Sequence, residues 1–307
     1  MKGYKAFEKG LVCRGKQYRE NTIFEEAEAM ICHSGMHFCK APLDVLSHYP
    51  LVDDNGNMSD FAEVEALDEC FTDDNKKYCT KKLKIGAKID FAKLVQASVR
   101  FDFEKETAEK MHDATDEKIT SKKNYAKIGS SGDYAKIGSS GDYAKIGSSG
   151  DYAKIGSSGY SAQIGSSGYS AKIGSSGYSA QIGSSGDYAK IGSSGYSAQI
   201  GSSGDYAKIG SSGDYAKIGS SGDSAQIGSS GDYAKITSEG KYAVVCCAGH
   251  GSIVKAKKGS WITLAEWTRN NDGEFVPKCV KTEFVDGERI KEDVYYQLID
   301  GEFVGRN

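Results

Sequence analysis

The residues with the clearest potential for chemistry lie in one short segment near the N-terminus, CHSGMHFC at residues 32–39. Thiolates and imidazoles are ligands that Zn²⁺ prefers, and four such side chains fall within this segment. In an extended strand His33, His37 and Cys39 share one face, which makes these three the candidate metal ligands. The spacing lacks the paired C-x-x-C halves of a structural zinc site. Buried thiols and a structural histidine are therefore the favoured interpretation, and zinc stays open as an alternative.

Nucleophilic catalysis is the second chemistry that this segment could support. Cys39 with His37 or His48 is the arrangement that would place a base beside a thiol. No recognisable nucleophile motif surrounds Cys39 in the sequence. We therefore favour a non-enzymatic protein, while an enzyme in the N-terminal region stays open.

A nine-residue repeat supplies the other candidate site. From Asn124 to about Gly240 the chain repeats DYAKIGSSG, with the variants YSAQIGSSG and YSAKIGSSG. Alanine recurs every nine residues from Ala126 to Ala243 without a slip, which gives 14 units. This fixed apolar register argues against a disordered Gly/Ser linker. Ala and Ile stand two residues apart, so we expect them on one face of a short strand, with Tyr and Lys on the other.

The repeat predicts a mainly β fold, a flattened β-solenoid with a thin core of Ala and Ile. Each unit is expected to form a strand and a Gly-Ser-Ser-Gly corner. Nine residues are too few to close a coil, so we expect two units per coil and about seven coils, stacked about 4.8 Å apart. An 18-residue coil places a row of Gln on one face and a row of Lys on the other. The candidate binding surface is Tyr134, Lys136, Tyr152, Lys154, Lys172, Tyr188, Lys190, Tyr206, Lys208, Gln163, Gln181 and Gln199.

The outward rows of Tyr beside Lys have two interpretations. Cross-strand ring stacking would stiffen the rod, and a regular Tyr/Lys/Asp/Gln face would bind a protein partner. Single-stranded nucleic acid is disfavoured, because alternating Asp offsets the lysine charge. Calcium is disfavoured as well, because Tyr160, Tyr178 and Tyr196 replace Asp and interrupt a carboxylate ladder.

Composition excludes further classes of protein. The 307 residues contain 39 Lys+Arg and 42 Asp+Glu, a net charge of −3, so bulk attraction to nucleic acid or anionic membranes is not expected. No run of about 18 apolar residues occurs, so we expect no membrane span. The N-terminus has no apolar signal-like segment, and the cysteines are accordingly expected to be free thiols.

The array also divides the chain into expected domains. Residues 1–110 are expected to form a small α+β domain. Its strands are predicted at Tyr4–Phe7, Ala62–Ala66 and Lys81–Ile89, and its helix near Pro42–Tyr49. Residues 111–123 form a connector, with a polar helix over residues 105–118. The solenoid covers residues 124–254. Three Asp-Gly turns, at residues 272, 286 and 300, predict a β-meander over residues 255–307 that caps the solenoid.

The segments KGYKAF, CRGKQY, CHSGMHFCKAPLDVLSHYP and FAEVEAL resemble an uncharacterised domain family of phage and gut-bacterial genomes, whose members often precede Gly-Ser nonapeptide arrays. The resemblance covers roughly residues 1–100, and its G-x-H-x-C core is Gly35, His37 and Cys39. No activity accompanies it. It implies a phage or prophage accessory protein in the bacterial host cytoplasm, with the virion as the alternative location.

These features together predict a non-enzymatic, phage-associated interaction protein. Its rod would present repeated sites to a host or virion partner and in this way block a component of host defence. Two alternatives stay open: a nucleotide-binding, metal-binding or enzymatic head with the rod as scaffold, and a structural component of the virion. The sequence leaves the partner, the coil handedness and the oligomeric state undetermined.

Overall fold

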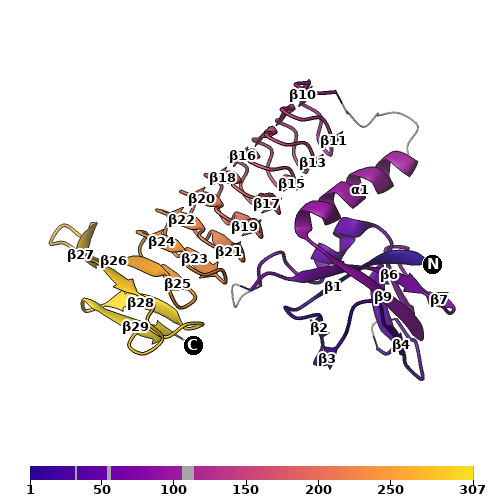
Figure 1. The fold of residues 1–307 in the computed structure, drawn as a ribbon, viewed down its shortest axis with the longest axis horizontal. Helices are drawn as coiled ribbons and strands as arrows, with labels where there is room; N and C mark the ends of the chain where they lie inside the picture. Colours follow the sequence, from indigo (N-terminus) through magenta and orange to yellow (C-terminus); the bar gives the residue numbers. More distant parts are fainter. Residues whose placement is uncertain (32, 54–56, 106–113, 307) are drawn as a thin grey trace.

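The computed structural model describes residues 1–31, 33–53, 57–105 and 114–306. A β-sheet head lies along one side of a long β-solenoid, and two hairpins continue the far end of the solenoid (Figure 1). The mainly β fold predicted from the sequence is therefore confirmed, with an N-terminal sheet domain, a solenoid and C-terminal strands.

The head is an antiparallel sheet in the order β4-β9-β6-β1-β5-β8-β7, with a small separate β2-β3 hairpin. Its strands are β1 (Lys2–Phe7), β2 (Val12–Cys13), β3 (Lys16–Gln17), β4 (Ile23–Glu25), β5 (Met36–Cys39), β6 (Asp60–Ala66), β7 (Cys70–Phe71), β8 (Lys77–Thr80) and β9 (Lys82–Ile89). The expected strands correspond to β1, β6 and β9. The expected helix near Pro42 is the 3₁₀ helix η1 (Pro42–Ser47).

Helix α1 (Phe91–Lys105) follows β9 and was not predicted. The polar helix expected over residues 105–118 falls mostly on residues outside the described ranges. The sequence carried a pattern for α1, because Phe91, Leu94 and Val95 recur at helical spacing and are all buried. Within the described residues no helix is both long and apolar enough to cross a membrane.

The solenoid makes about eight turns over residues 118–264, all of them described. Each turn contributes one strand to each of two parallel sheets, which we call the open sheet and the covered sheet. The open sheet contains β10 (Lys118–Ser121), β12 (Lys136–Ser139), β14 (Lys154–Ser157), β16 (Lys172–Ser175), β18 (Lys190–Ser193), β20 (Lys208–Ser211), β22 (Gln226–Ser229), β24 (Val244–Cys247) and β26 (Trp261–Arg269). The covered sheet contains β11 (Lys127–Ser130), β13 (Lys145–Ser148), β15 (Gln163–Ser166), β17 (Gln181–Ser184), β19 (Gln199–Ser202), β21 (Lys217–Ser220), β23 (Lys235–Ser238) and β25 (Ile253–Lys255).

The strand pairing confirms the 18-residue coil predicted from the sequence, because paired residues stand 18 positions apart. Lys154 pairs with Lys172 in the open sheet, and Gln163 pairs with Gln181 in the covered sheet. The extra turn, relative to the seven expected, arises because β10, β25 and β26 lie outside the nonapeptide array and still pair with it. Strand β10 falls within the expected connector.

The strand and the corner of each unit lie elsewhere than predicted. The strand is Lys/Gln-Ile-Gly-Ser, and the corner is formed by the following Ser-Gly-Asp-Tyr-Ala, so tyrosine belongs to the corner. Tyr188, for example, is left-handed, with a φ of 57°. The corner glycine is required by close stacking of coils, because a Cβ at Gly186 would lie 2.0 Å from the carbonyl oxygen of Gly168.

The core of the solenoid is narrow, as expected, and contains a third residue type. Ile182 and Ala180 are fully buried, and Ser184 points inward beside them. The first serine of each Ser-Ser pair therefore belongs to the core, because it stands two residues after the inward isoleucine.

Two hairpins continue the solenoid at its C-terminal end. β26 pairs with β27 (Phe275–Phe284) and extends the open sheet, whereas β28 (Tyr295–Ile299) and β29 (Glu302–Arg306) extend the covered sheet. The turns at Gly273 and Gly301 join these strands, as the Asp-Gly pairs predicted. Val285 and Ile290 are buried in the solenoid core, so this end is covered.

Candidate functional site

A glycine furrow runs along the outer face of each solenoid sheet. In the strand Lys/Gln-Ile-Gly-Ser, the first residue and the glycine face outward while Ile and Ser face the core. The parallel register aligns each glycine with the glycine 18 residues later, as in Gly174 with Gly192 and Gly183 with Gly201. Each sheet therefore presents a row of long polar side chains beside a row without side chains.

Helix α1 lies lengthwise in the furrow of the covered sheet (Figure 1). A Cβ added at Gly183 would lie 2.2 Å from the ring of Phe91. One added at Gly165 would lie 2.9 Å from Val95. A helical turn of about 5.4 Å nearly matches a coil spacing of about 4.8 Å, so the helix meets about one glycine per turn.

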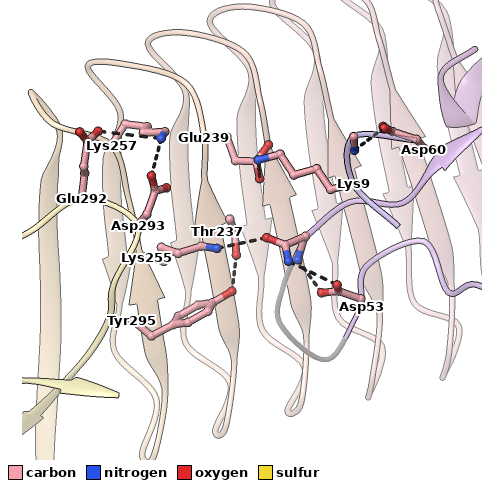
Figure 2. Close-up of polar contacts among 12 residues, drawn as sticks. Lys9, Asp53, Asp60, Thr237, Glu239, Lys255, Lys257, Glu292, Asp293 and Tyr295 are labelled. Atoms are coloured by element: carbon pink, nitrogen blue, oxygen red, sulfur yellow. Dashed lines mark hydrogen bonds and ion pairs between the residues drawn. The ribbon is translucent and has the colours of Figure 1, made fainter. Parts of the chain in front are cut away.

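The furrow of the covered sheet stays filled beyond α1. Met58 lies over the next two glycines, with atoms 2.8 Å from a Cβ at either Gly201 or Gly219. In β23 the glycine is replaced by Thr237, whose hydroxyl shares a hydrogen bond of 2.5 Å with the hydroxyl of Tyr295 (Figure 2). Glycine thus leaves space for the head, and the furrow position carries a side chain, that of Thr237, where the C-terminal hairpin covers the sheet.

Polar contacts also join the head to the far part of the solenoid (Figure 2). Lys9 Nζ forms an ion pair of 2.5 Å with Glu239. Lys255 Nζ donates to Asn57 Oδ1 at 3.2 Å. Near the other end, Gln96 Nε2 donates to the carbonyl oxygen of Ser148 at 2.9 Å. The head therefore contacts most of the length of the covered sheet.

The glutamine row of the candidate surface belongs to this covered sheet. Gln163, Gln181 and Gln199 are half-buried, and Gln163 Nε2 donates to Gln181 Oε1 at 3.1 Å. Gln199 Oε1 accepts a hydrogen bond of 3.4 Å from the backbone N–H of Val52. A neutral amide suits this place, because covering an ammonium without a counter-ion costs free energy. These three residues lie at the boundary between head and solenoid.

The five lysines of the candidate surface lie on the open sheet. Together with Lys118, which was not among the candidates, they form what we call the lysine row: Lys118, Lys136, Lys154, Lys172, Lys190 and Lys208. They border a shallow groove of about 880 Å³ whose floor is the second glycine furrow. A Cβ added at Gly174, Gly192 or Gly210 would meet no other part of the described chain within 4 Å. The same backbone that holds α1 on one sheet is therefore accessible on the other.

The lysine row keeps most of its charge unpaired. Lys136 pairs with Asp116 at 2.7 Å, but no carboxylate of the described residues lies within 4.0 Å of the four lysines that follow, Lys154, Lys172, Lys190 and Lys208. The aspartates expected to offset them have another partner. Asp187 Oδ1, for example, accepts the backbone N–H of Asp205, one coil later, at 2.9 Å.

The candidate tyrosines form a ladder along the corner that precedes the open-sheet strands. The rings of Tyr134 and Tyr152 stack at 5.0 Å between centroids, and those of Tyr188 and Tyr206 stack at 4.9 Å. Tyr169 continues the ladder between these two pairs. Ring stacking is therefore present, and the four candidate tyrosine residues are still 42–51 % exposed.

The candidate metal ligands His33, His37 and Cys39 line a pocket in the head without forming a metal site. Among the described residues no group of three or more His, Cys, Asp or Glu could hold a metal ion. Burial, with Lys5 nearby, lowers the pKa of His37 to about 4, and burial raises the pKa of Cys39 to about 12. A protonated thiol is a poor metal ligand and a poor nucleophile. Cys32 lies outside the described residues.

The comparisons with known proteins concern the head alone. Residues 1–97 match a domain family of unknown function, DUF7666. The DUF7666 match spans the head sheet and ends within α1. No curated protein and no solved structure matches the chain. The match therefore supports the N-terminal region as a unit and brings no activity with it.

Proposed function

We propose that the chain is a non-enzymatic interaction protein whose open sheet binds an acidic helix of a partner protein. The observation that carries this proposal is the pair of furrows. One furrow holds α1 beside a row that is glutamine at its centre. The other has the same Ile-Gly-Ser backbone beside the lysine row, most of whose lysines have no carboxylate of the described residues within 4.0 Å. An acidic helix of the partner would lie in the open furrow in the way that α1 lies in the covered one.

Helix geometry fits the lysine row. Carboxylates at positions i and i+3 or i+4 of a helix are separated by a rise of about 4.5–6 Å, close to the strand spacing of about 4.8 Å between successive lysines. Small residues on the same helix would face the glycine furrow. One exposed ion pair contributes about 0–1 kcal/mol, so affinity would come from several pairs acting together with the apolar contact.

The biological setting is also part of the proposal. The resemblance of the N-terminal segments supports a phage-associated accessory protein in a bacterial host cytoplasm. In that setting the partner is a host protein, such as a component of host defence, or a virion protein. Mass spectrometry of purified particles distinguishes a partner of the virion from a component built into it.

Binding of a designed peptide tests the lysine row. The probe is a 20-residue helix with alanine along one stripe and glutamate at every third or fourth position, followed by fluorescence anisotropy. The fourfold variant Lys154→Gln, Lys172→Gln, Lys190→Gln and Lys208→Gln gives the open sheet the neutral residues found at the centre of the covered sheet. We expect it to weaken binding at least tenfold and to remove most of the salt dependence.

A matched variant controls for the loss of four charges. It changes four exposed lysines of the head, Lys2→Gln, Lys40→Gln, Lys81→Gln and Lys84→Gln, and should bind the peptide like the unaltered chain. Absence of saturable binding, or equal losses in both variants, contradicts the proposal. Tighter binding of a DNA duplex through the same four lysines would replace the protein partner with nucleic acid.

A further inference from the structure

The head contains a pocket of about 510 Å³, within the usual range of small-molecule sites. Its walls come from β1, β5, β8, the β2-β3 hairpin and η1. It is far in sequence from the glycine furrows, and none of its lining residues belongs to the solenoid. The pocket is thus a second site, independent of the lysine row.

Lys5 is the unusual residue of this pocket. Its side chain is only 5 % exposed. Its Nζ donates to the carbonyl oxygen of His37 at 2.8 Å, approaches Cys13 Sγ at 3.5 Å, and lies 5.3 Å from the ring centre of Phe7. No carboxylate of the described residues lies within 4.0 Å of it. Buried ammonium groups are normally paired with an anion, so Lys5 lacks the partner that its burial calls for.

The remaining charges of the pocket do not supply this partner. Glu26 is the acidic residue among the described lining residues, and it is already bound by Lys16 Nζ at 2.7 Å and by the backbone N–H of Gly35 at 3.1 Å. Arg14, exposed at the tip of the β2-β3 hairpin, also lines the pocket and has no ion pair within the described chain. The pocket therefore carries excess positive charge.

We propose that this pocket binds a small organic oxyanion, a molecule that carries a phosphate or carboxylate group. The anionic group lies beside Lys5 and Arg14 and provides the missing counter-ion. Charge-assisted hydrogen bonds to such a group are roughly twice as strong as neutral ones. The body of the ligand lies against Tyr18 and Tyr49, the latter held in place by a hydrogen bond of 3.2 Å from its hydroxyl to Cys13 Sγ.

Calorimetric titration of the full chain tests this site. The probes are inorganic phosphate, adenosine 5′-monophosphate, ribose 5-phosphate and benzoate. We expect saturable one-to-one binding of at least one organic probe. Whether the phosphate probes or benzoate bind more tightly identifies the preferred anionic group. Arg14→Gln and Lys5→Met should each weaken that binding at least tenfold. Lys84→Gln, which removes a lysine charge from an exposed position of β9, should leave it unchanged.

Two results would overturn the proposal. One is the absence of binding of all four probes to the unaltered chain. The other is a probe that binds Arg14→Gln and Lys84→Gln equally well. Because Arg14 is exposed in a turn, its variant keeps the test decisive even where Lys5→Met fails to fold. Peptide binding by the lysine row is measured separately, so failure at one site leaves the other result intact.

Discussion

The two sheets of the solenoid are built from the same nine-residue unit, yet one is covered by the head and the other faces solvent. Their strands share the Ile-Gly-Ser sequence and the same parallel register. They differ at the residue before isoleucine. In the covered sheet it is glutamine in the three central strands and lysine in the strands on either side, and in the open sheet it is lysine from Lys118 to Lys208. The repeat thus forms the same glycine furrow on both sheets, and the residue beside it varies from unit to unit.

The largest difference between the sheets should appear when their glycines are replaced. Gly183→Ala places a methyl group against Phe91 of α1, and such overpacking costs about 1–3 kcal/mol. Gly192→Ala makes the same change on the open sheet, where the described chain leaves space, so the unfolding free energy should change by about 0.5 kcal/mol or less. Denaturant titration together with hydrogen exchange of α1 measures both variants. Equal destabilisation would show that α1 does not occupy the furrow.

An intermediate effect is expected when lysine enters the glutamine positions. Gln199→Lys removes the acceptor of the Val52 N–H and places an ammonium at the head boundary, which should cost about 1–2 kcal/mol. Gln226→Lys makes the same exchange on the open sheet, at an exposed position beside Lys208. It should leave stability unchanged and lengthen the lysine row. Thermal unfolding compares the two variants. If Gln199→Lys is as stable as the unaltered chain, a neutral side chain is not required at the head boundary.

The smallest effect concerns the tyrosine ladder beside the open sheet and a second ladder that contains Tyr178, Tyr196 and Tyr215. The ladder beside the open sheet is interrupted at Ser224, between Tyr206 and Tyr242, and all three residues are left-handed. Ser224→Tyr should complete the stack and raise stability by about 0.5–1 kcal/mol. Ser197→Tyr is the control, because Tyr196 of the same unit already stacks in the other ladder. A gain of equal size in both variants would point to a cause other than ring stacking.

Periodicity made the solenoid predictable before any contact was known. Alanine at every ninth residue fixed the unit, and the 18-residue recurrence of Gln163 and Gln181 fixed two strands per turn. The position of the corner was harder, because glycine serves two purposes here. One glycine of each unit avoids a clash between coils and the other opens the furrow, as Gly186 and Gly183 do. A preference for turns does not separate these two functions.

Docking of the head could not be inferred from hydrophobic patterning. Phe91 and Val95 do form an apolar stripe, but the surface that receives them is a row of glycines, which no hydrophobicity pattern marks as a partner. Lys5 was missed for a related reason. It lies in a central strand that is buried on both faces, so alternation of polar and apolar residues gives no indication of where its side chain lies. Only the fold brings it to Arg14 and the pocket.

Because each turn contains two strands, the insertion or deletion of an even number of units differs in its effect from that of an odd number. Loss or gain of 18 residues removes or adds one complete turn and leaves every later strand in its own sheet, so the lysine row stays on the side away from the head. Loss of nine residues moves every later strand to the opposite sheet, so lysines such as Lys190 would lie beneath the head and glutamines such as Gln199 would face solvent. An even number of inserted or deleted units therefore keeps both outer faces as they are, and an odd number exchanges them. Rods of this kind are therefore expected to differ in length by whole pairs of units.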